Sequence, residues 1–444
     1  MIKEFEIALE VLTDVLDQKT PFAEALRSKF QKNLDLRPLR GLVAGLVGCE
    51  LRHQLYFDFM LNGLETYEVE EKRLLALALA NAFFFRRFDA TLVHESLKER
   101  FGEEKLALAQ PLFDLTETPE NYIPDTVDRR GAQYLSLRFN VPEWMVKILN
   151  HFGGAAAYQS LRKFSRPFAT TLRVRTSALG MKKVLENPDF TEAAVPGMVV
   201  YKGTTPLRKI PEFRKGQLFP EKLLTKHILD AHPVAEPSEV LLYNGNADPS
   251  LELELIETYG ANVGMNIAVP DVDKKVEVTK LIKEKNLHNV NFFSAPDPES
   301  MEASVSGMQK LVVVAPNSTN FDLIPTSPDY MLHFDRNSMD SLIEGERKAL
   351  EGAAKYVDEG GTLLYIVYTI SKKEGHGRIS DFLKAHREFK LVSEEQHFPY
   401  EELETAAYVC ELRKGAEELT IPPAFADLAT SATNSASIPQ ASAK

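Results

Sequence analysis

The sequence predicts a multidomain protein with an all-helical N-terminal part, a small α+β unit and a doubly wound α/β domain. Residues 1–125 repeat apolar side chains at helical spacing. Residues 226–413 alternate short runs rich in Val, Leu and Ile with helical segments. The stretch 126–225 mixes the two patterns. With 444 residues the chain is long enough for each part to bury a core of its own.

The N-terminal part is expected to consist of packed helices. Apolar residues recur every three or four positions in FEIALEVLTDVL, LRGLVAGLVGCELRHQLYFDFML and RLLALALANAFFFRRF. The apolar run from Leu74 to Phe85 is far shorter than the roughly 20 residues that a membrane span needs, so a buried helix is expected and no membrane association. Pro111, Pro119 and Pro124 break the pattern, which places a boundary near residue 125.

The middle unit is expected to contain two strands and two helices. VPEWMVKILNHFG is typical of a helix that ends at the following glycine pair, and SALGMKKVLEN of a second helix. FATTLRVRT and GMVVYKG are typical of strands. In the first strand Arg173 and Arg175 would share one face, with Leu172 and Val174 on the other.

The C-terminal domain is expected to be Rossmann-like. Strands are predicted at 238–246, 262–269, 289–295, 310–318, 362–370 and 405–414. Helices are predicted at 251–260, 276–285, 340–359 and 381–389, the third stopping at Gly360-Gly361. Almost continuous apolar strands between helices indicate a parallel sheet buried on both faces. The last segment, 414–444, is rich in Ala, Ser, Thr and Pro and is expected to be a disordered tail.

Charge is distributed unevenly along the chain. Between His151 and Thr225 there are 13 basic and five acidic residues, a net charge of +8, whereas the whole chain carries −12, which leaves −20 for the rest. A basic middle in an acidic protein predicts a local site for a polyanion, and the alternative is a solvated basic face. The candidate contacts are Arg162, Lys163, Arg166, Arg173 and Arg175.

Cysteine usage and the N-terminus indicate the cytoplasm. The two cysteines, Cys49 and Cys410, are far apart and fit neither a disulfide framework nor a metal site. The opening MIKEFEIALEVL contains acidic residues and no small-residue cleavage site, so it does not predict a signal peptide.

Three segments, in order, resemble one family. RGLVAGLVGCELRHQLYFD resembles a helix of NusB-like RNA-binding domains. LSLRFNVPEWMVKILNHFG with RPFATTLRVRT, and SLIEGERKALEGAAKYVDEGGTLLYIVYTISKKEG, are similar to segments of the RsmB/NOP-type RNA (cytosine-5) methyltransferases. Over residues 1–413 the chain resembles the bacterial RsmB-like branch. The resemblance implies a NusB-like domain, an RNA-binding subdomain, a Rossmann-like methyltransferase domain, S-adenosylmethionine as cofactor and ribosomal RNA as partner.

The family's catalytic residues do not carry over. Its nucleophile is a cysteine in a Thr-Cys-Ser motif after the fifth strand, where this chain has Tyr368. Its second cysteine, in Asp-Ala-Pro-Cys-Ser, is matched by Asn317, and the aspartate of that motif by Val314. The attack on cytosine needs a thiolate that can later leave. A tyrosine with a pKa of about 10 is a poor substitute, so no catalytic residue is expected.

The family's cofactor loop is also altered. It reads Asp-x-Cys-Ala-Ala-Pro-Gly-Gly-Lys-Thr, and the matching segment here contains Asn244, a single glycine at Gly245, and Ser250 in place of the lysine. An acid that follows the second strand and binds ribose is matched by Asn266. These three positions, Asn244, Gly245 and Asn266, are the degenerate cofactor-site candidates. The adenine-facing acid after the third strand is matched by Ala295 or Asp297.

Three functional hypotheses follow. The first is an RNA-binding pseudoenzyme of the 16S ribosomal RNA (cytosine-5) methyltransferase family that has lost its active site. The second is an active S-adenosylmethionine-dependent methyltransferase with an atypical site. The third is a protein-interaction role for the NusB-like part. Concerted change at the nucleophile, the second cysteine, the aspartate and the cofactor loop favours the first.

Overall fold

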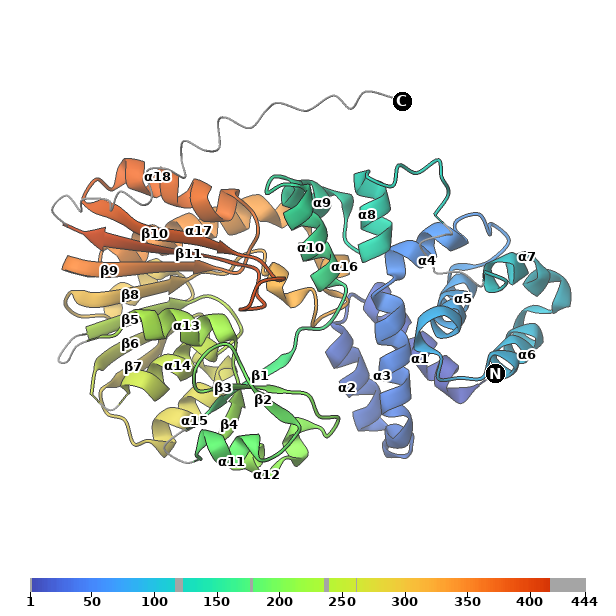
Figure 1. The fold of residues 1–444 in the computed structure, drawn as a ribbon, viewed down its shortest axis with the longest axis horizontal. Coiled ribbons are helices and arrows are strands. Elements are labelled where there is room, and N and C mark those ends of the chain that lie inside the picture. Colours follow the sequence, from blue (N-terminus) through green and yellow to red (C-terminus); the bar gives the residue numbers. More distant parts are fainter. Residues whose placement is uncertain (1, 116–122, 176–178, 235–238, 261, 416–444) are drawn as a thin grey trace, which may run out of the picture.

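The computed structural model describes residues 2–115, 123–175, 179–234, 239–260 and 262–415. It has a helical part, a small antiparallel sheet and a larger seven-stranded sheet (Figure 1). Most of the predicted tail, 416–444, lies outside the described residues. Among the residues described, no helix has the length and apolar character needed to cross a bilayer.

The N-terminal helices share one core, as the sequence predicts. Phe5, Leu12, Leu46, Phe57 and Leu75 all belong to this buried cluster. The helices are α1 (Lys3–Leu16), α2 (Phe22–Lys32), α3 (Arg40–Leu51), α4 (Gln54–Leu61), α5 (Val69–Ala80), the π-helical turn η2 (Asn81–Phe85), α6 (Ala90–Phe101) and α7 (Glu103–Phe113).

Three further helices connect this part to the α/β domain. They are α8 (Ala132–Phe139), α9 (Glu143–Asn150) and α10 (Gly154–Phe164). Helical structure therefore extends beyond residue 125, to Phe164. Helix α9 ends at Asn150, before the glycine pair that was expected to end it. Gly153, with a φ of +95°, instead precedes α10, and Gly154 is the first residue of that helix. Met145 and Leu161 pack in one cluster with Phe321 of the α/β domain.

The small sheet has four antiparallel strands in the order β2-β3-β1-β4. These are β1 (Thr170–Val174), β2 (Phe190–Glu192), β3 (Met198–Tyr201) and β4 (Leu218–Pro220), with short helices α11 (Met181–Leu185) and α12 (Pro211–Arg214). The predicted strands β1 and β3 are confirmed, and so is the burial of Leu172 and Val174. The strands β2 and β4 have three residues each, too few to show an alternating pattern.

The large sheet has the order β10-β11-β9-β8-β5-β6-β7. Its strands are β5 (Glu239–Asn244), β6 (Gly264–Val269), β7 (Val290–Ser294), β8 (Gln309–Ala315), β9 (Val357–Val367), β10 (Phe389–His397) and β11 (Ala407–Lys414). Strands β5 to β9 are parallel, as predicted, but β11 runs antiparallel to both β9 and β10. The sheet is therefore mixed.

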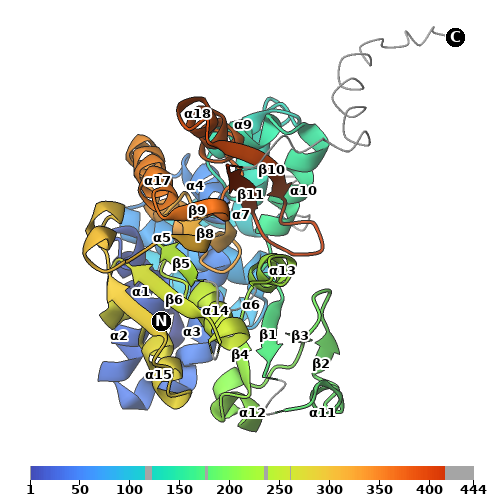
Figure 2. The ribbon, with the colours of Figure 1, turned by 90° about the vertical axis from the view of Figure 1, so that its left-hand side faces the viewer.

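Helices cover both faces of this sheet (Figure 2). One face carries α13 (Leu223–Ala231), α14 (Ser250–Tyr259) and α15 (Val276–Glu284). The other carries α17 (Met339–Ala354) and α18 (Arg378–Ala385). Burial on both faces is the reason that the central strands β5 and β8 read as continuous apolar runs.

The expectation that Gly360-Gly361 stops the preceding helix is wrong. Helix α17 ends at Ala354, and the glycine pair lies within β9. Gly360 has a φ of +70°, and a Cβ on Gly361 would lie 2.8 Å from the carbonyl oxygen of Asp358. The pairing of β8 with β9 is irregular at this point. The two glycines therefore allow a bulge in a strand and do not stop a helix.

Candidate functional site

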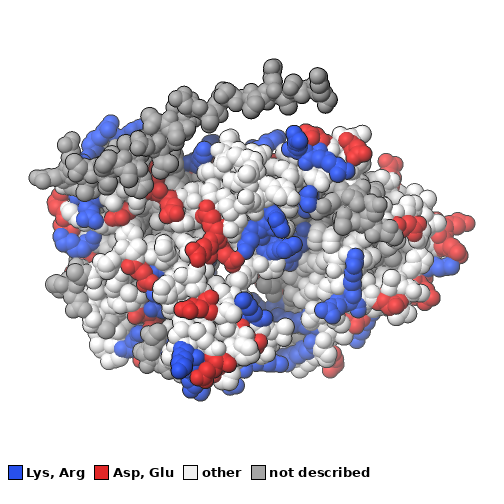
Figure 3. Space-filling view, in the orientation of Figure 1, with Lys and Arg blue, Asp and Glu red and all other residues white. Residues whose placement is uncertain are grey.

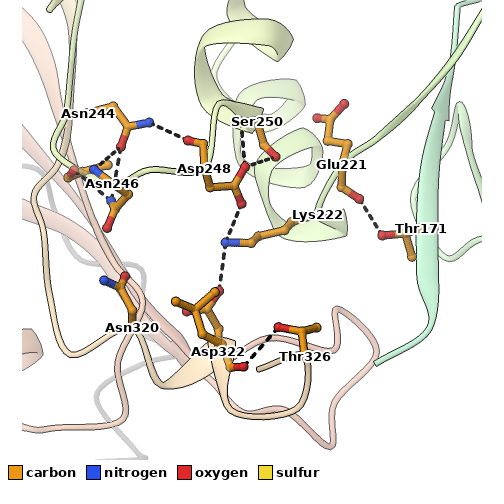
Figure 4. A network of polar contacts seen from close by, with 12 residues as sticks. Thr171, Glu221, Lys222, Asn244, Asn246, Asp248, Ser250, Asn320, Asp322 and Thr326 are labelled. Atoms are coloured by element: carbon orange, nitrogen blue, oxygen red, sulfur yellow. Dashed lines mark hydrogen bonds and ion pairs between the residues drawn. The ribbon is translucent and has the colours of Figure 1, made fainter. Parts of the chain in front are cut away.

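The carboxyl ends of β5, β8 and β9 meet at one edge of the large sheet, the usual ligand edge of such a domain. Three positions named from the sequence lie here: Asn244 is the last residue of β5, Asn317 follows β8, and Tyr368 follows β9. The segment between β4 and α13 brings Lys222 to the same place (Figure 4).

The loop after β5 is closed by its own amide side chains. Asn244 is buried, and its Nδ2 donates to the Asp248 carbonyl at 3.0 Å and to Oε2 of Glu252 at 2.9 Å. Asn246 donates from Nδ2 to the Ala315 carbonyl at 3.0 Å and from its backbone to Oδ1 of Asn244 at 3.0 Å. These bonds tie the loop to the end of β8.

A carboxylate of the chain occupies the start of α14. Oδ1 of Asp248 accepts hydrogen bonds from the Ser250 backbone at 2.9 Å and from its hydroxyl at 2.6 Å. The first turn of a helix is where an external anion would bind, and here that place is taken. Nearby, a Cβ on Gly245 would lie 2.7 Å from the Asn317 nitrogen, so the two loops are in close contact.

Lys222 joins two carboxylates over the ring of Tyr368. Its Nζ lies 2.8 Å from Oδ2 of Asp248 and 2.8 Å from Oδ2 of Asp322 (Figure 4). The same Nζ is 3.9 Å from the ring centroid of Tyr368. Burial alone would raise the pKa of Asp248, but the Lys222 ammonium and the Ser250 hydrogen bonds lower it to about 2. For Asp322 burial outweighs Lys222, so its pKa is raised. Against burial, the carboxylates raise the pKa of Lys222 well above its ordinary value.

Tyr368 itself is buried below this cation. Burial raises the pKa of its hydroxyl to about 12, although Lys222 opposes the shift. The phenol is therefore protonated at neutral pH. Asn317, at the second cysteine position, is exposed and accepts a hydrogen bond from Asn320 at 3.0 Å.

Comparisons with known proteins find similarity in sequence and in fold. No family model matches the sequence. The chain is 24% identical over 424 residues to the probable ribosomal RNA small subunit methyltransferase B of Bacillus subtilis (strain 168), which covers 87% of this chain and 89% of that protein. Over most of its length this chain is therefore similar in sequence to a ribosomal RNA small subunit methyltransferase.

Solved structures share the fold. The crystal structure of PH0851 has a TM-score of 0.71 at 17% identity, covering 93% of this chain and 99% of that one. NSun6 from Pyrococcus horikoshii, solved with the S-adenosylmethionine analogue SFG, has a TM-score of 0.53 at 12% identity, covering 62% and 99%. The expected layout of a helical region, a small sheet and a Rossmann-like sheet is thus confirmed.

One of the residues expected at the cofactor site lies elsewhere in the structure. Asn266 does not follow the second strand but lies inside β6, where Oδ1 accepts a hydrogen bond from Asn291 at 3.0 Å. The residues after the strand are Pro270 and Asp271. The apolar pattern of β6 continues for three residues past Asn266, and this signal could have corrected the placement. After β7, Ala295 is buried and Asp297 caps a short helix.

Three of the five basic candidates pair with acidic residues of the same chain. Arg173 pairs with Glu254. The Nε of Arg175 lies 2.6 Å from Oε1 of Glu257. Both acids belong to α14, so the arginine face of β1 packs on the α/β domain. Lys163 pairs with Glu404.

Arg162 and Arg166 are different, because they line a cavity of about 560 Å³ beside the N-terminal helices. The wall also contains His53, Phe84 and Tyr158, which the sequence analysis did not single out. The signal was present: Tyr158, Arg162 and Arg166 are four residues apart, a spacing that places side chains on one helical face. In the space-filling view, Lys and Arg side chains gather near the centre of the visible face (Figure 3).

Proposed function

We propose that this RsmB-like chain is an RNA-binding protein that does not transfer methyl groups, and that its RNA is ribosomal RNA of the small subunit. The observation that carries the proposal is the Lys222 cluster. One ammonium group joins Asp248 to Asp322 and covers Tyr368, so ion pairs of the chain fill the space beside the nucleophile position.

The loop contacts support the loss of S-adenosylmethionine binding, because the residues present do not fit this cofactor. Its carboxylate would need free donors at the start of α14, but Asp248 accepts from Ser250 there. The loop amides of Asn244 and Asn246 are used on the chain's own carbonyl and carboxylate oxygens. An external ligand would have to displace charge-assisted bonds, which are the stronger class of hydrogen bond.

The nucleophile position supports the same proposal. A protonated, buried phenol does not add to a pyrimidine ring as a thiolate does. The two cysteines of the chain cannot replace it, since Cys410 is buried in β11 and Cys49 is partly buried in α3. Burial raises the pKa of each thiol.

The RNA part of the proposal is supported by the family and by two arginines. The Bacillus subtilis relative is named as a ribosomal RNA small subunit methyltransferase. Arg162 and Arg166 are exposed and form no ion pair with another described residue. A guanidinium without a carboxylate partner is available to fork onto phosphate oxygens.

Calorimetry with S-adenosylmethionine tests the proposal. We expect no saturable heat at micromolar concentrations, where binding would correspond to about −8 kcal/mol. The same preparation should bind small-subunit ribosomal RNA, which shows that it is folded. A clear micromolar isotherm, or transfer of a labelled methyl group to that RNA, would favour an active enzyme with an atypical site. If the purified chain binds no RNA and associates with RNA only through partner proteins, the protein-interaction role is favoured.

A further inference from the structure

We propose that the cavity between the N-terminal helices and α10 binds one unpaired nucleotide of RNA, with its base against an aromatic wall and its phosphate on Arg162 and Arg166. This inference rests on the proposed RNA binding and names the place where a base is held. The cavity has a volume of about 560 Å³, within the roughly 300–1,000 Å³ range of sites for small ligands.

One wall of the cavity is aromatic. The His53 ring is stacked on Phe84, with centroids 3.7 Å apart and planes 9° apart. On the α10 side Tyr158 is 39% exposed, and its edge contact with Phe139 has a centroid distance of 5.5 Å. Unpaired bases stack on such rings with about 1–3 kcal/mol per base.

His53 contributes to this wall as a neutral ring. Its Nδ1 lies 2.8 Å from the Cys49 carbonyl, so Nδ1 carries the hydrogen and Nε2 is left as an acceptor. Burial lowers the pKa of His53 to about 4. The ring is therefore uncharged at physiological pH.

The rim of the cavity is basic. Arg162 lies on α10, and Arg166 follows the end of this helix. Arg138 also lines the cavity, and its guanidinium is 5.9 Å from the Tyr158 ring centroid. An aromatic wall beside arginines is the combination that proteins use for single-stranded nucleic acid, where stacking is joined to phosphate contacts.

The test uses the full chain and a short single-stranded oligoribonucleotide with one 2-aminopurine, whose fluorescence falls when it stacks. We expect binding with quenching. Tyr158→Leu should weaken binding about 5- to 150-fold, the range expected for one stacked base, and remove the quenching, whereas Tyr158→Phe should keep both. Replacing Arg162 and Arg166 by Gln should weaken binding and reduce the log–log salt slope by about 0.7 for each lost contact.

A matched control has the same loss of charge elsewhere. Lys182 and Lys183 are exposed on α11, and their double replacement by Gln should leave quenching unchanged. If Tyr158→Leu and the arginine variant bind and quench as the parent does, the cavity is not the site, while RNA binding stands. If the lysine control loses as much RNA affinity as the arginine variant, the overall positive charge is responsible for binding and the inference fails. If the parent binds no RNA, both proposals are overturned.

Discussion

Replacing Lys222 by methionine should destabilise the α/β domain by about 3–4 kcal/mol. Nζ is 2.8 Å from both Asp248 and Asp322, and the Asp322 side chain is only 4% exposed. Removing one partner of a buried ion pair costs about 3–5 kcal/mol because a buried charge is left alone. Asp248 keeps its two hydrogen bonds from Ser250, so the lower half of this range is expected.

Denaturant unfolding followed by tryptophan fluorescence measures this loss. The single tryptophan, Trp144, lies 6.2 Å from Phe321 between ring centroids, so its signal reports on the α/β core. The matched control is the double variant Lys222→Met/Asp322→Asn, which removes the orphaned carboxylate as well. It should recover most of the lost stability, because replacing both partners of a pair is far less costly than removing one.

The pH dependence gives an independent readout. Without the Lys222 ammonium, the pKa of Asp322 should rise further above its ordinary value. A raised carboxyl pKa means that the folded state holds the proton more tightly, so this contribution is present at low pH and lost as pH rises. The stability deficit of Lys222→Met should therefore be smaller at pH 5 than at pH 8. A deficit below about 1 kcal/mol, equal at both pH values, would refute the reasoning.

Three further outcomes are expected. The Tyr368→Cys variant should form no 5-methylcytosine in small-subunit RNA, because the nucleophile, the aspartate of the Asp-Ala-Pro-Cys-Ser motif and the methyl donor act as a unit. Detectable product would mean that the cofactor site works. Arg173→Ala/Arg175→Ala should lower the unfolding free energy by about 3–5 kcal/mol and leave the RNA salt slope unchanged; a slope flatter by about one unit would make them RNA contacts. Burial and neighbouring Glu374 raise the pKa of Glu346 from 4.5 to about 10, so stability should fall as pH rises between these values. Glu346→Gln should reduce this fall, and equal melting shifts from pH 5 to pH 8 in variant and parent would contradict it.

Some features follow from the sequence because they depend on neighbouring residues. Strands β5 and β8 and the second half of β9 are readable as apolar runs, since a strand buried on both faces needs Val, Leu or Ile at nearly every position. The replacement of the family's two cysteines is also visible in the sequence, because the motifs around Tyr368 and Asn317 can be aligned with those of the family. Strand β10 was missed because most of its side chains are exposed and polar, as in an edge strand.

The partners of the charged residues were decided by the tertiary structure alone. By sequence, Lys222 was one of 13 basic residues in a segment that resembles an RNA-binding unit. The order of the strands brings it to Asp322, 100 positions later in the chain. Likewise, Arg173 and Arg175 alternate with buried aliphatics as predicted, but the packing of β1 on α14 decides that acids face them. Side-chain alternation is a local property, whereas the identity of an ion-pair partner depends on which distant elements the fold places together.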